Sequence, residues 1–273
     1  MPFPPLSQHA MIFVAKYGLL TDQDGSRFLR RRPDGEGGER IIGRLQRRKT
    51  AGILPRWRLH DAVDGGWGNG LLAPVVQPAW GVNFGRSGAT TASFIAEGRW
   101  ANVTAYLKEY AAAYDCYVTI SFGHNDQKPA NNVPFDVYQQ NLINFANEVK
   151  SLGGAALLVS SLTRRVFPSD PHNATDSLHN ERLAAIEAAE TTGSTIIDLN
   201  AASLAYVNAI GRDASWVYNW GDDRKDMTHL NPYGEVVFGR MVADLIVRAK
   251  PGLERWIAPN ETLSYDIWNN LPA

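Results

Sequence analysis

An aspartate and a histidine, Asp226 and His229, stand three residues apart shortly before the last predicted helix. A carboxylate at this spacing can hydrogen-bond an imidazole, fix its tautomer and stabilise the imidazolium that forms when the ring takes a proton. The pair is therefore suited to act as a general base and its orienting acid. The competing interpretation is a helix cap, because Asn231 and Pro232 follow directly and favour a helix start.

Two further patterns are suited to stabilise a developing oxyanion. The turn Gly123-His-Asn-Asp126 follows an apolar run, and the Asn125 amide is a hydrogen-bond donor of the type such sites use. Gly88 lies in a second turn, where a residue without Cβ lets a backbone N–H approach a substrate closely. Ordinary Gly/Asn/Asp turns are the alternative interpretation of both patterns.

These turns need elements that bring them together. From residue 62 onward, strand-like runs alternate with helix-like ones, which predicts a parallel sheet covered by helices on both faces. Active residues of such sheets gather at the carboxyl ends of the strands, so the loops after Phe84, Phe122 and Asp198 are expected near the site. The spacing predicts strands at 82–84, 117–122, 155–160 and 194–198, and helices at about 101–113, 134–152, 174–189 and 232–249.

The order of these patterns resembles the SGNH (GDSL-like) hydrolase family. A glycine-rich turn is followed by a strand ending in Gly-His-Asn-Asp, and then by Asp-x-x-His before the last helix. Longer strings resemble the rhamnogalacturonan acetylesterase branch of that family, within residues 62–250: these are 88–100, 118–129, 162–167, 196–203 and 226–246. The resemblance implies an α/β, three-layer flavodoxin-like fold with a parallel sheet of about five strands and helices on both faces.

The resemblance also assigns roles residue by residue. Gly88, through its N–H, and Asn125, through its amide, match the oxyanion hole, while His229 matches the general base and Asp226 its orienting acid. The implied function is removal of O-acetyl groups from a pectic polysaccharide by Ser-His-Asp chemistry, with an acetylated polysaccharide or oligosaccharide as partner. No cofactor is implied, and no metal is expected, because the six His show no ligand spacing.

The nucleophile of that family is missing. Its serine belongs to a Gly-Asp-Ser block at the end of the first strand, and this sequence contains no such block. Gly65-Gly-Trp-Gly68 resembles the family's segment downstream of the block, so Arg56 to Asp61 occupy the block's expected position. We therefore expect the chain to lack the first strand as well. Ser87 and Ser93 lie on the glycine loop, but nothing in the sequence makes either a substitute nucleophile.

A shifted reading frame accounts for the missing block. Codons exist for Arg56 to Asp61 that encode Ala-Gly-Asp-Ser-Thr-Thr when read one nucleotide later. Trp57 has a single codon, so the glycine is forced, whereas the aspartate and the serine each require one particular third base. The hypothesis is that residues up to about 61 arise from an out-of-frame reading or a misplaced splice junction.

The chain is expected to divide near residue 62. Residues 62–273 form the SGNH hydrolase-like domain, and residues 1–61 are an atypical Arg-rich segment, out of frame or disordered. Two alternatives to an active esterase stay open: a catalytically dead paralogue that still binds a glycan, and a basic arm at residues 23–58 that binds nucleic acid. The formal net charge of -1 argues against nucleic acid or an anionic membrane as partner.

Secretion is a weaker expectation. The apolar run at residues 10–15 is short and lacks a preceding basic region, so it is a poor signal peptide. Acceptor triplets for N-glycosylation nevertheless occur at Asn102, Asn173 and Asn260. The lone cysteine, Cys116, excludes an internal disulfide and is expected to be a small buried hydrophobe. A monomer is the expected state.

Overall fold

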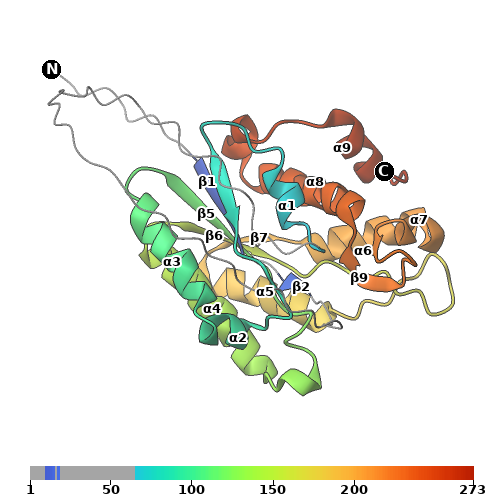
Figure 1. Ribbon diagram of the computed structural model, residues 1–273, viewed down its shortest axis with the longest axis horizontal. Coiled ribbons are helices and arrows are strands. Elements are labelled where there is room, and N and C mark those ends of the chain that lie inside the picture. The colour runs from blue at the N-terminus through green and yellow to red at the C-terminus, as the bar shows by residue number, and fades with distance from the viewer. Residues whose placement is uncertain (1–9, 16, 19–64) are drawn as a thin grey trace, which may run out of the picture. The chain divides into compact units, whose positions relative to one another are not determined.

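The computed structural model describes residues 10–15, 17–18 and 65–273 (Figure 1). These residues belong to one compact unit. The Arg-rich segment at residues 23–58 and the stretch from Arg56 to Asp61 lie outside the described residues. No helix in the described part of the chain is long and apolar enough to cross a membrane.

Five parallel strands form the central sheet, in the order β3-β1-β5-β6-β7. They are β1 (Ala10–Ala15), β3 (Trp80–Asn83), β5 (Asp115–Ile120), β6 (Ala155–Val159) and β7 (Thr195–Ile197). This confirms the expected α/β fold with a parallel sheet. Two small ladders lie beside it: β2 (Tyr17–Gly18) pairs with β4 (Arg86–Ser87), and β8 (Asn219–Trp220) pairs with β9 (Asp226–Leu230).

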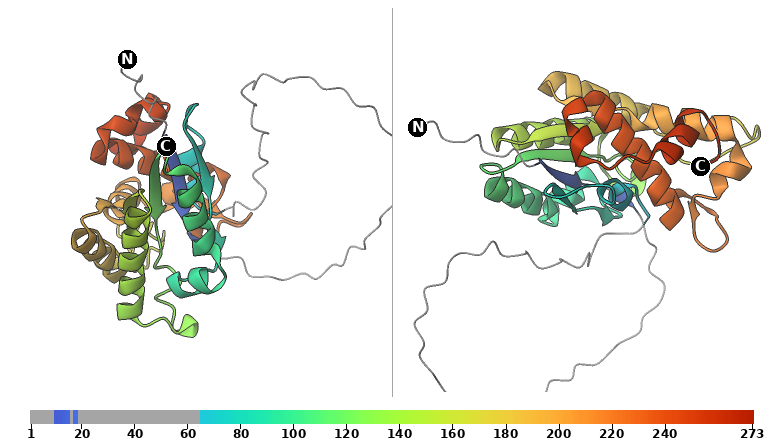
Figure 2. Two further views of the ribbon diagram at one scale, coloured as in Figure 1. Left: turned by 90° about the vertical axis from the view of Figure 1, so that its left-hand side faces the viewer. Right: turned by 90° about the horizontal axis from the view of Figure 1, so that it is seen from above.

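The expectation that the first strand is missing is wrong. β1 lies between β3 and β5, with Phe13 in register with Val82 on one side and with Val118 on the other (Figure 2). Six residues are too few for a leader's apolar region, but a strand buried in a parallel sheet needs only four to eight. The apolar run that looked like a poor signal peptide is therefore a central strand.

Helices cover both faces of the sheet, as predicted. Side chains of β6 alternate between two cores: Ala156 and Leu158 join one, and Leu157 and Val159 join the other. The first core is closed by α2 (Thr91–Ala96), α3 (Arg99–Tyr110), α4 (Phe135–Ser151) and α5 (His179–Thr192). The second is closed by α1 (Gly68–Leu72), α6 (Leu199–Ile210), α8 (Pro232–Ala249) and α9 (Glu261–Trp268), and α7 (Arg212–Trp216) follows α6.

One helix begins later than its spacing predicts. Helix α5 starts at His179, five residues after the expected start at 174. The backbone before it is bonded elsewhere, because the Ala174 N–H donates to the Asn208 side chain and the Thr175 N–H donates to the Val166 carbonyl. These long-range bonds replace the first helical turn, and a local spacing rule contains no information about them.

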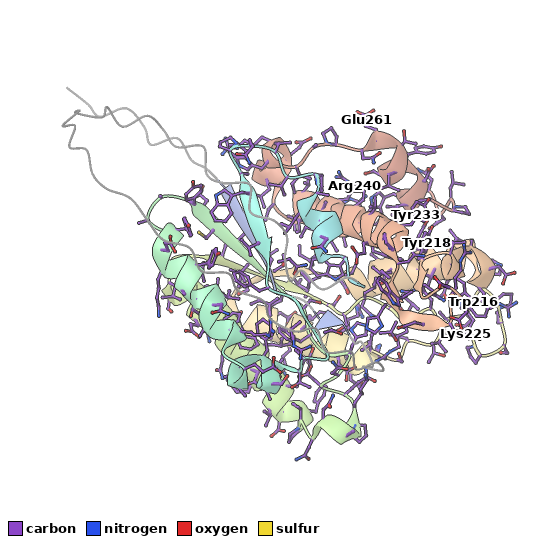
Figure 3. The ribbon with its side chains drawn as sticks, viewed as in Figure 1. Trp216, Tyr218, Lys225, Tyr233, Arg240 and Glu261 are labelled. Atoms are coloured by element: carbon purple, nitrogen blue, oxygen red, sulfur yellow. The ribbon has the colours of Figure 1, made fainter. Side chains whose placement is uncertain are left out.

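Helices α1 and α8 cross at very short range. A Cβ added to Gly239 would lie 2.3 Å from the backbone carbon of Gly70, so only glycines fit at this crossing. The crossing brings the segment that begins at Gly65 beside the start of α8. In the first turn of α8, Tyr233 packs against Tyr218, with ring centroids 5.8 Å apart (Figure 3). The residues just before α8 are therefore held from two directions.

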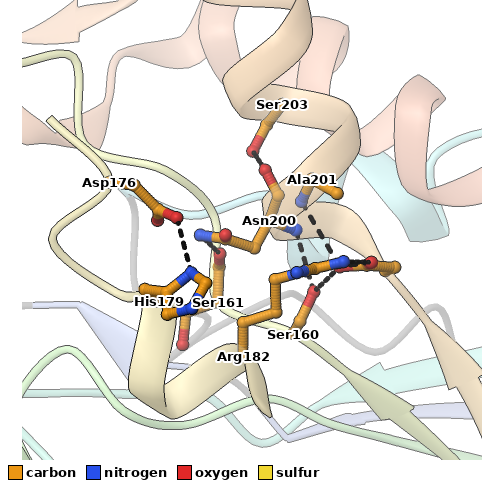
Figure 4. A network of polar contacts seen from close by, with 9 residues as sticks. Ser160, Ser161, Asp176, His179, Arg182, Asn200, Ala201 and Ser203 are labelled. Atoms are coloured by element: carbon orange, nitrogen blue, oxygen red, sulfur yellow. Dashed lines mark hydrogen bonds and ion pairs between the residues drawn. The ribbon is translucent and has the colours of Figure 1, made fainter. Parts of the chain in front are cut away.

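A polar network fixes the carboxyl ends of β6 and β7 (Figure 4). Arg182 pairs with Asp198 at 2.6 Å, and the Ser160 hydroxyl donates to Asp198 and accepts from the Asn200 N–H. Burial opposes ionisation of Asp198, but its hydrogen bonds from Arg182 and Ser160 outweigh burial and lower its pKa. In this network Asp198 ties α5 to the start of α6.

Candidate active site

The predicted aspartate–histidine pair is formed. Nδ1 of His229 lies 2.5 Å from Oδ2 of Asp226, and the other carboxylate oxygen accepts the backbone N–H groups of Thr228 and His229. Both residues lie on β9, a short strand before α8 that the sequence analysis did not predict, and its pairing with β8 has a register irregularity. The cap is a separate residue: Asn231 accepts the Gly234 N–H at the start of α8.

The geometry keeps Asp226 ionised. Burial opposes its charge, but the hydrogen bonds from the His229 ring and from the His229 and Thr228 backbones outweigh burial and lower the pKa of Asp226 to about 2. An ionised carboxylate at Nδ1 leaves the far nitrogen of the imidazole as the one that accepts a proton. His229 itself is 7% exposed. The arrangement is that of a general base with a fixed tautomer.

A glycine holds one side of the imidazole. Gly65 has φ of +98°, and a Cβ placed there would lie 3.3 Å from Cβ and 3.4 Å from Cδ2 of His229. The Glu235 carboxylate accepts the N–H groups of Gly65 and Gly66 at 2.5 and 3.2 Å, and the Gly65 carbonyl accepts the Leu230 N–H. The buried Glu235 therefore fixes this glycine segment against His229. Sequence reasoning found the segment but not its partner.

The two predicted oxyanion residues are brought to one place. Asn125 is fully buried, and its Nδ2 donates to the Ala89 carbonyl at 3.2 Å, one residue beyond Gly88. Its Oδ1 is buried and has no hydrogen-bond partner. Gly88 has φ of +78°, and a Cβ placed there would have no atom within 4 Å. The glycine turn is therefore open to space beside a buried amide.

Asp126 forms hydrogen bonds with residues beside both the Gly88 turn and the Asn125 turn. Its Oδ1 accepts both the N–H and the hydroxyl of Thr91 at 2.7 Å, and its Oδ2 accepts the Gly123 N–H at 3.2 Å. Burial raises the pKa of this carboxyl, while the hydrogen bonds from Thr91 and Gly123 oppose the rise. The first residues of α2 are thus tied to the turn after β5, which sets the distance between Gly88 and Asn125.

Two adjacent arginines connect the oxyanion turn with the histidine strand. Arg164 donates to the His124 carbonyl at 3.1 Å, and Arg165 donates to the His229 carbonyl at 2.6 Å. Arg165 is fully buried and also donates to Asn219 at 2.5 Å. Its burial lowers its pKa to about 10, against the pull of the Asp226 charge. Sequence reasoning gave neither arginine a role, although two adjacent charges in the segment after a predicted buried strand were a usable signal.

Neither serine of the glycine loop is placed as a nucleophile. Ser93 serves the capping box of α2, where its hydroxyl accepts the Thr90 N–H. Ser87 is buried, and its hydroxyl has no hydrogen-bond partner, so no base activates it in this structure. The residues that follow β1 are Lys16, Tyr17 and Gly18, so Gly-Asp-Ser is absent at the end of the first strand also.

Two further kinds of site, a metal centre and a reactive thiol, can be assessed in the part of the chain that the structure describes. The described residues contain no group of three or more His, Cys, Asp or Glu side chains placed to hold a metal ion. Cys116 is 2% exposed, as expected of a small buried hydrophobe, and burial raises the pKa of its thiol to about 11.

The sequence matches the profile of the GDSL-like lipase/acylhydrolase family over residues 50–236. The chain is also similar to the rhamnogalacturonan acetylesterase RhgT of Bacillus subtilis. The two are 29% identical over 196 residues, which make up 68% of this chain and 82% of the relative.

Two solved structures are similar to this fold. The protein YxiM of Bacillus subtilis matches with a TM-score of 0.64 and 16% identity over 89% of this chain, which spans only 57% of that protein. Axe2, an acetylxylan esterase from Geobacillus stearothermophilus, matches with a TM-score of 0.53 and 21% identity, over 89% of this chain and 95% of its own.

Proposed function

Because the chain belongs to the GDSL-like lipase/acylhydrolase family, a family of ester hydrolases, we propose that its natural task is to remove O-acetyl groups from a pectic polysaccharide. The observation that carries the proposal is the 2.5 Å contact between an ionised Asp226 and His229, whose strand is linked through Arg165 and Arg164 to the turn that holds the buried Asn125. Similarity to RhgT, named a rhamnogalacturonan acetylesterase, supports the pectic substrate.

The reaction runs through a serine ester. The serine oxygen attacks the acetyl carbonyl while His229 takes its proton, and Asp226 stabilises the imidazolium. The negative charge on the carbonyl oxygen is stabilised by the Gly88 N–H and the Asn125 amide. His229 returns the proton to the departing sugar oxygen. Water then attacks the acetyl-serine with His229 again as base, releasing acetate and restoring the serine.

The serine belongs to a Gly-Asp-Ser block that the printed chain does not contain. Strand β1 ends at Ala15, and Gly65 lies against His229. The block therefore belongs directly after Ala15, and residues 16–61 interrupt the path from this strand to Gly65. In the shifted frame the block reads Ala-Gly-Asp-Ser-Thr-Thr, so its alanine corresponds to Ala15. A message that joins Ala15 to this shifted frame, and returns to the printed frame near Ala62, would encode the complete site.

The absence of Gly-Asp-Ser also favours a second candidate: a chain that binds acetylated glycan without cleaving it. Removing the nucleophile of a triad leaves only the residual catalysis of the oxyanion hole and of binding. This candidate predicts glycan binding by the printed chain with no acetate release. Sequencing of the transcript distinguishes the active esterase from the glycan-binding chain. A transcript that encodes the printed sequence without a frame change would favour the glycan-binding chain.

The substrate is tested with a joined chain in which Ala15 is followed by Gly-Asp-Ser-Thr-Thr and then by residues 62–273. We expect acetate release from acetylated rhamnogalacturonan to exceed release from acetylxylan, and to be lost when His229→Ala is added. Faster release from acetylxylan would contradict the pectic substrate. No release from either polymer by a folded joined chain would contradict the esterase.

Secretion follows from the proposed substrate, since polymeric pectin lies outside cells. The exposed positions of Asn102, Asn173 and Asn260 support it, because the acceptor asparagine of each triplet lies at the surface. Expression in a secreting host, followed by glycosidase treatment of the recovered protein, tests this: a single sharp band of unchanged mobility would contradict glycosylation.

A further inference from the structure

We propose that the cavity beside the oxyanion turn is a subsite for an acidic sugar, in which Lys128 binds a uronate carboxylate and Phe135 supports the sugar ring. The inference rests on the proposed function, because it names the part of an acetylated pectic chain that lies next to the reacting acetyl group. The cavity has a volume of about 630 Å³, within the range of small-molecule sites. Asp126, the residue after Asn125, lines this cavity.

Lys128 is the cation of this cavity. Its side chain is partly buried and lines the cavity, and no ion pair joins it to another described residue. Burial lowers the pKa of Lys128, and the Arg164 guanidinium lowers it further, while Asp226 acts in the opposite direction. An ammonium group that is partly desolvated and repelled by a neighbouring cation gains from an added carboxylate.

The cavity lining also contains three acidic residues, Asp126, Asp176 and Glu181. Both carboxylate oxygens of Asp126 accept hydrogen bonds, from Thr91 and from Gly123. Asp176 forms an ion pair with His179, with a distance of 3.0 Å between Oδ2 and Nδ1 (Figure 4). Burial raises the pKa of Glu181, which favours its neutral form. These groups therefore oppose a bound carboxylate less than their number suggests.

Phe135 supplies an apolar face. It is 49% exposed at the start of α4, and it also lines the cavity. The centroid of its ring lies 6.1 Å from that of the buried Tyr138. Sugar rings present C–H groups on one face, which pack on aromatic rings, while their edges carry hydroxyls. Lys128 and Phe135 together match a ring that carries a carboxylate.

The test measures binding of trigalacturonate and of the neutral xylotriose to the printed chain by calorimetry, so it requires no nucleophile. Variants Lys128→Gln and Phe135→Ala are compared with Lys108→Gln, an exposed lysine on α3 that serves as the control. We expect trigalacturonate to bind in preference to xylotriose, Lys128→Gln to weaken it about tenfold or more, and Lys128→Arg to retain most of the affinity. Phe135→Ala should weaken both sugars, and added salt should weaken trigalacturonate alone.

Equal binding of the two sugars, unchanged affinity in Lys128→Gln, or no binding of either sugar would overturn the subsite. An unchanged unfolding midpoint shows that a variant has kept its fold. The proposed function is tested by a separate measurement, the release of acetate by the joined chain. If the joined chain releases acetate from pectin and Lys128→Gln has no effect on binding, only the subsite is contradicted. If binding depends on Lys128 but the joined chain has no esterase activity, only the proposed esterase function is contradicted.

Discussion

The guanidinium of Arg165 donates a hydrogen bond of 2.6 Å to the backbone carbonyl of His229. The preceding residue, Arg164, donates to the carbonyl of His124 in the oxyanion turn. Two neighbouring side chains from the segment after β6 therefore hold the base and the oxyanion turn in a fixed relation. The site is organised by backbone contacts of residues that take no part in the proposed chemistry.

Replacing Arg165 by Met should destabilise the fold. The change leaves the Asn219 side chain and the His229 carbonyl without their charged donor in a fully buried place. Buried acceptors left unpaired cost about 1–3 kcal/mol each, so we expect a loss of roughly 2 kcal/mol or more in the free energy of unfolding. Urea unfolding measures it. Arg212→Met, which removes a more exposed guanidinium stacked on Trp216, is the control, and equal losses in the two variants would contradict the account.

The charge on Asp226 should stabilise the fold in a defined pH range. Its pKa of about 2 in the folded chain lies below the value of about 3.9 in an unfolded chain, so the ionised form favours folding above about pH 4. The contribution fades as the pH falls from 4 toward 2. The urea midpoint of Asp226→Asn should therefore lie below that of the unchanged protein at pH 6 and approach it at pH 2.5. Exposed Asp222→Asn is the control. A difference in urea midpoint between Asp226→Asn and the unchanged protein that does not narrow as the pH falls would contradict the prediction.

Two glycine substitutions should have different effects on His229. Gly65→Ala and Gly88→Ala both place a side chain at positive φ, which costs about 1–3 kcal/mol of strain. Only the first puts a methyl group 3.3 Å from the His229 side chain, whereas the second meets open space. The nitrogen resonances of the His229 ring should therefore shift in Gly65→Ala and stay in place in Gly88→Ala. Identical spectra of the two variants would show that Gly65 does not position the ring.

Asn125→Ala should affect both the fold and the chemistry. It removes the hydrogen bond to the Ala89 carbonyl, which costs about 1–3 kcal/mol when a buried acceptor is left unpaired. In the joined chain it also removes an oxyanion donor, and the turnover rate should fall about 10²-fold or more with little change in KM. Steady-state hydrolysis of a chromogenic acetate measures this. A change confined to KM would mean that Asn125 binds the ground state and not the developing charge.

The candidate site residues stand in local patterns of the sequence. Asp226 and His229 are three residues apart, and Gly88 and Asn125 each lie in a short turn. The order of these patterns along the chain, and its resemblance to a family, gave the residues their expected roles. The contacts that join them were not predictable, because Glu235 and Arg165 meet Gly65 and His229 across long stretches of chain. The first strand was missed for a similar reason. Six apolar residues at 10–15 acquire meaning only from β3 and β5 on either side.

The most direct test of the central claim compares hydrolysis of p-nitrophenyl acetate by the printed chain and by the joined chain. The claim is that the described residues supply a complete base and oxyanion site that lacks only its serine. We predict that the joined chain is faster by about 10³-fold or more, and that replacing the serine of its block by alanine abolishes the gain. Equal rates in the two chains, with His229→Ala reducing both, would contradict the claim and place the nucleophile elsewhere.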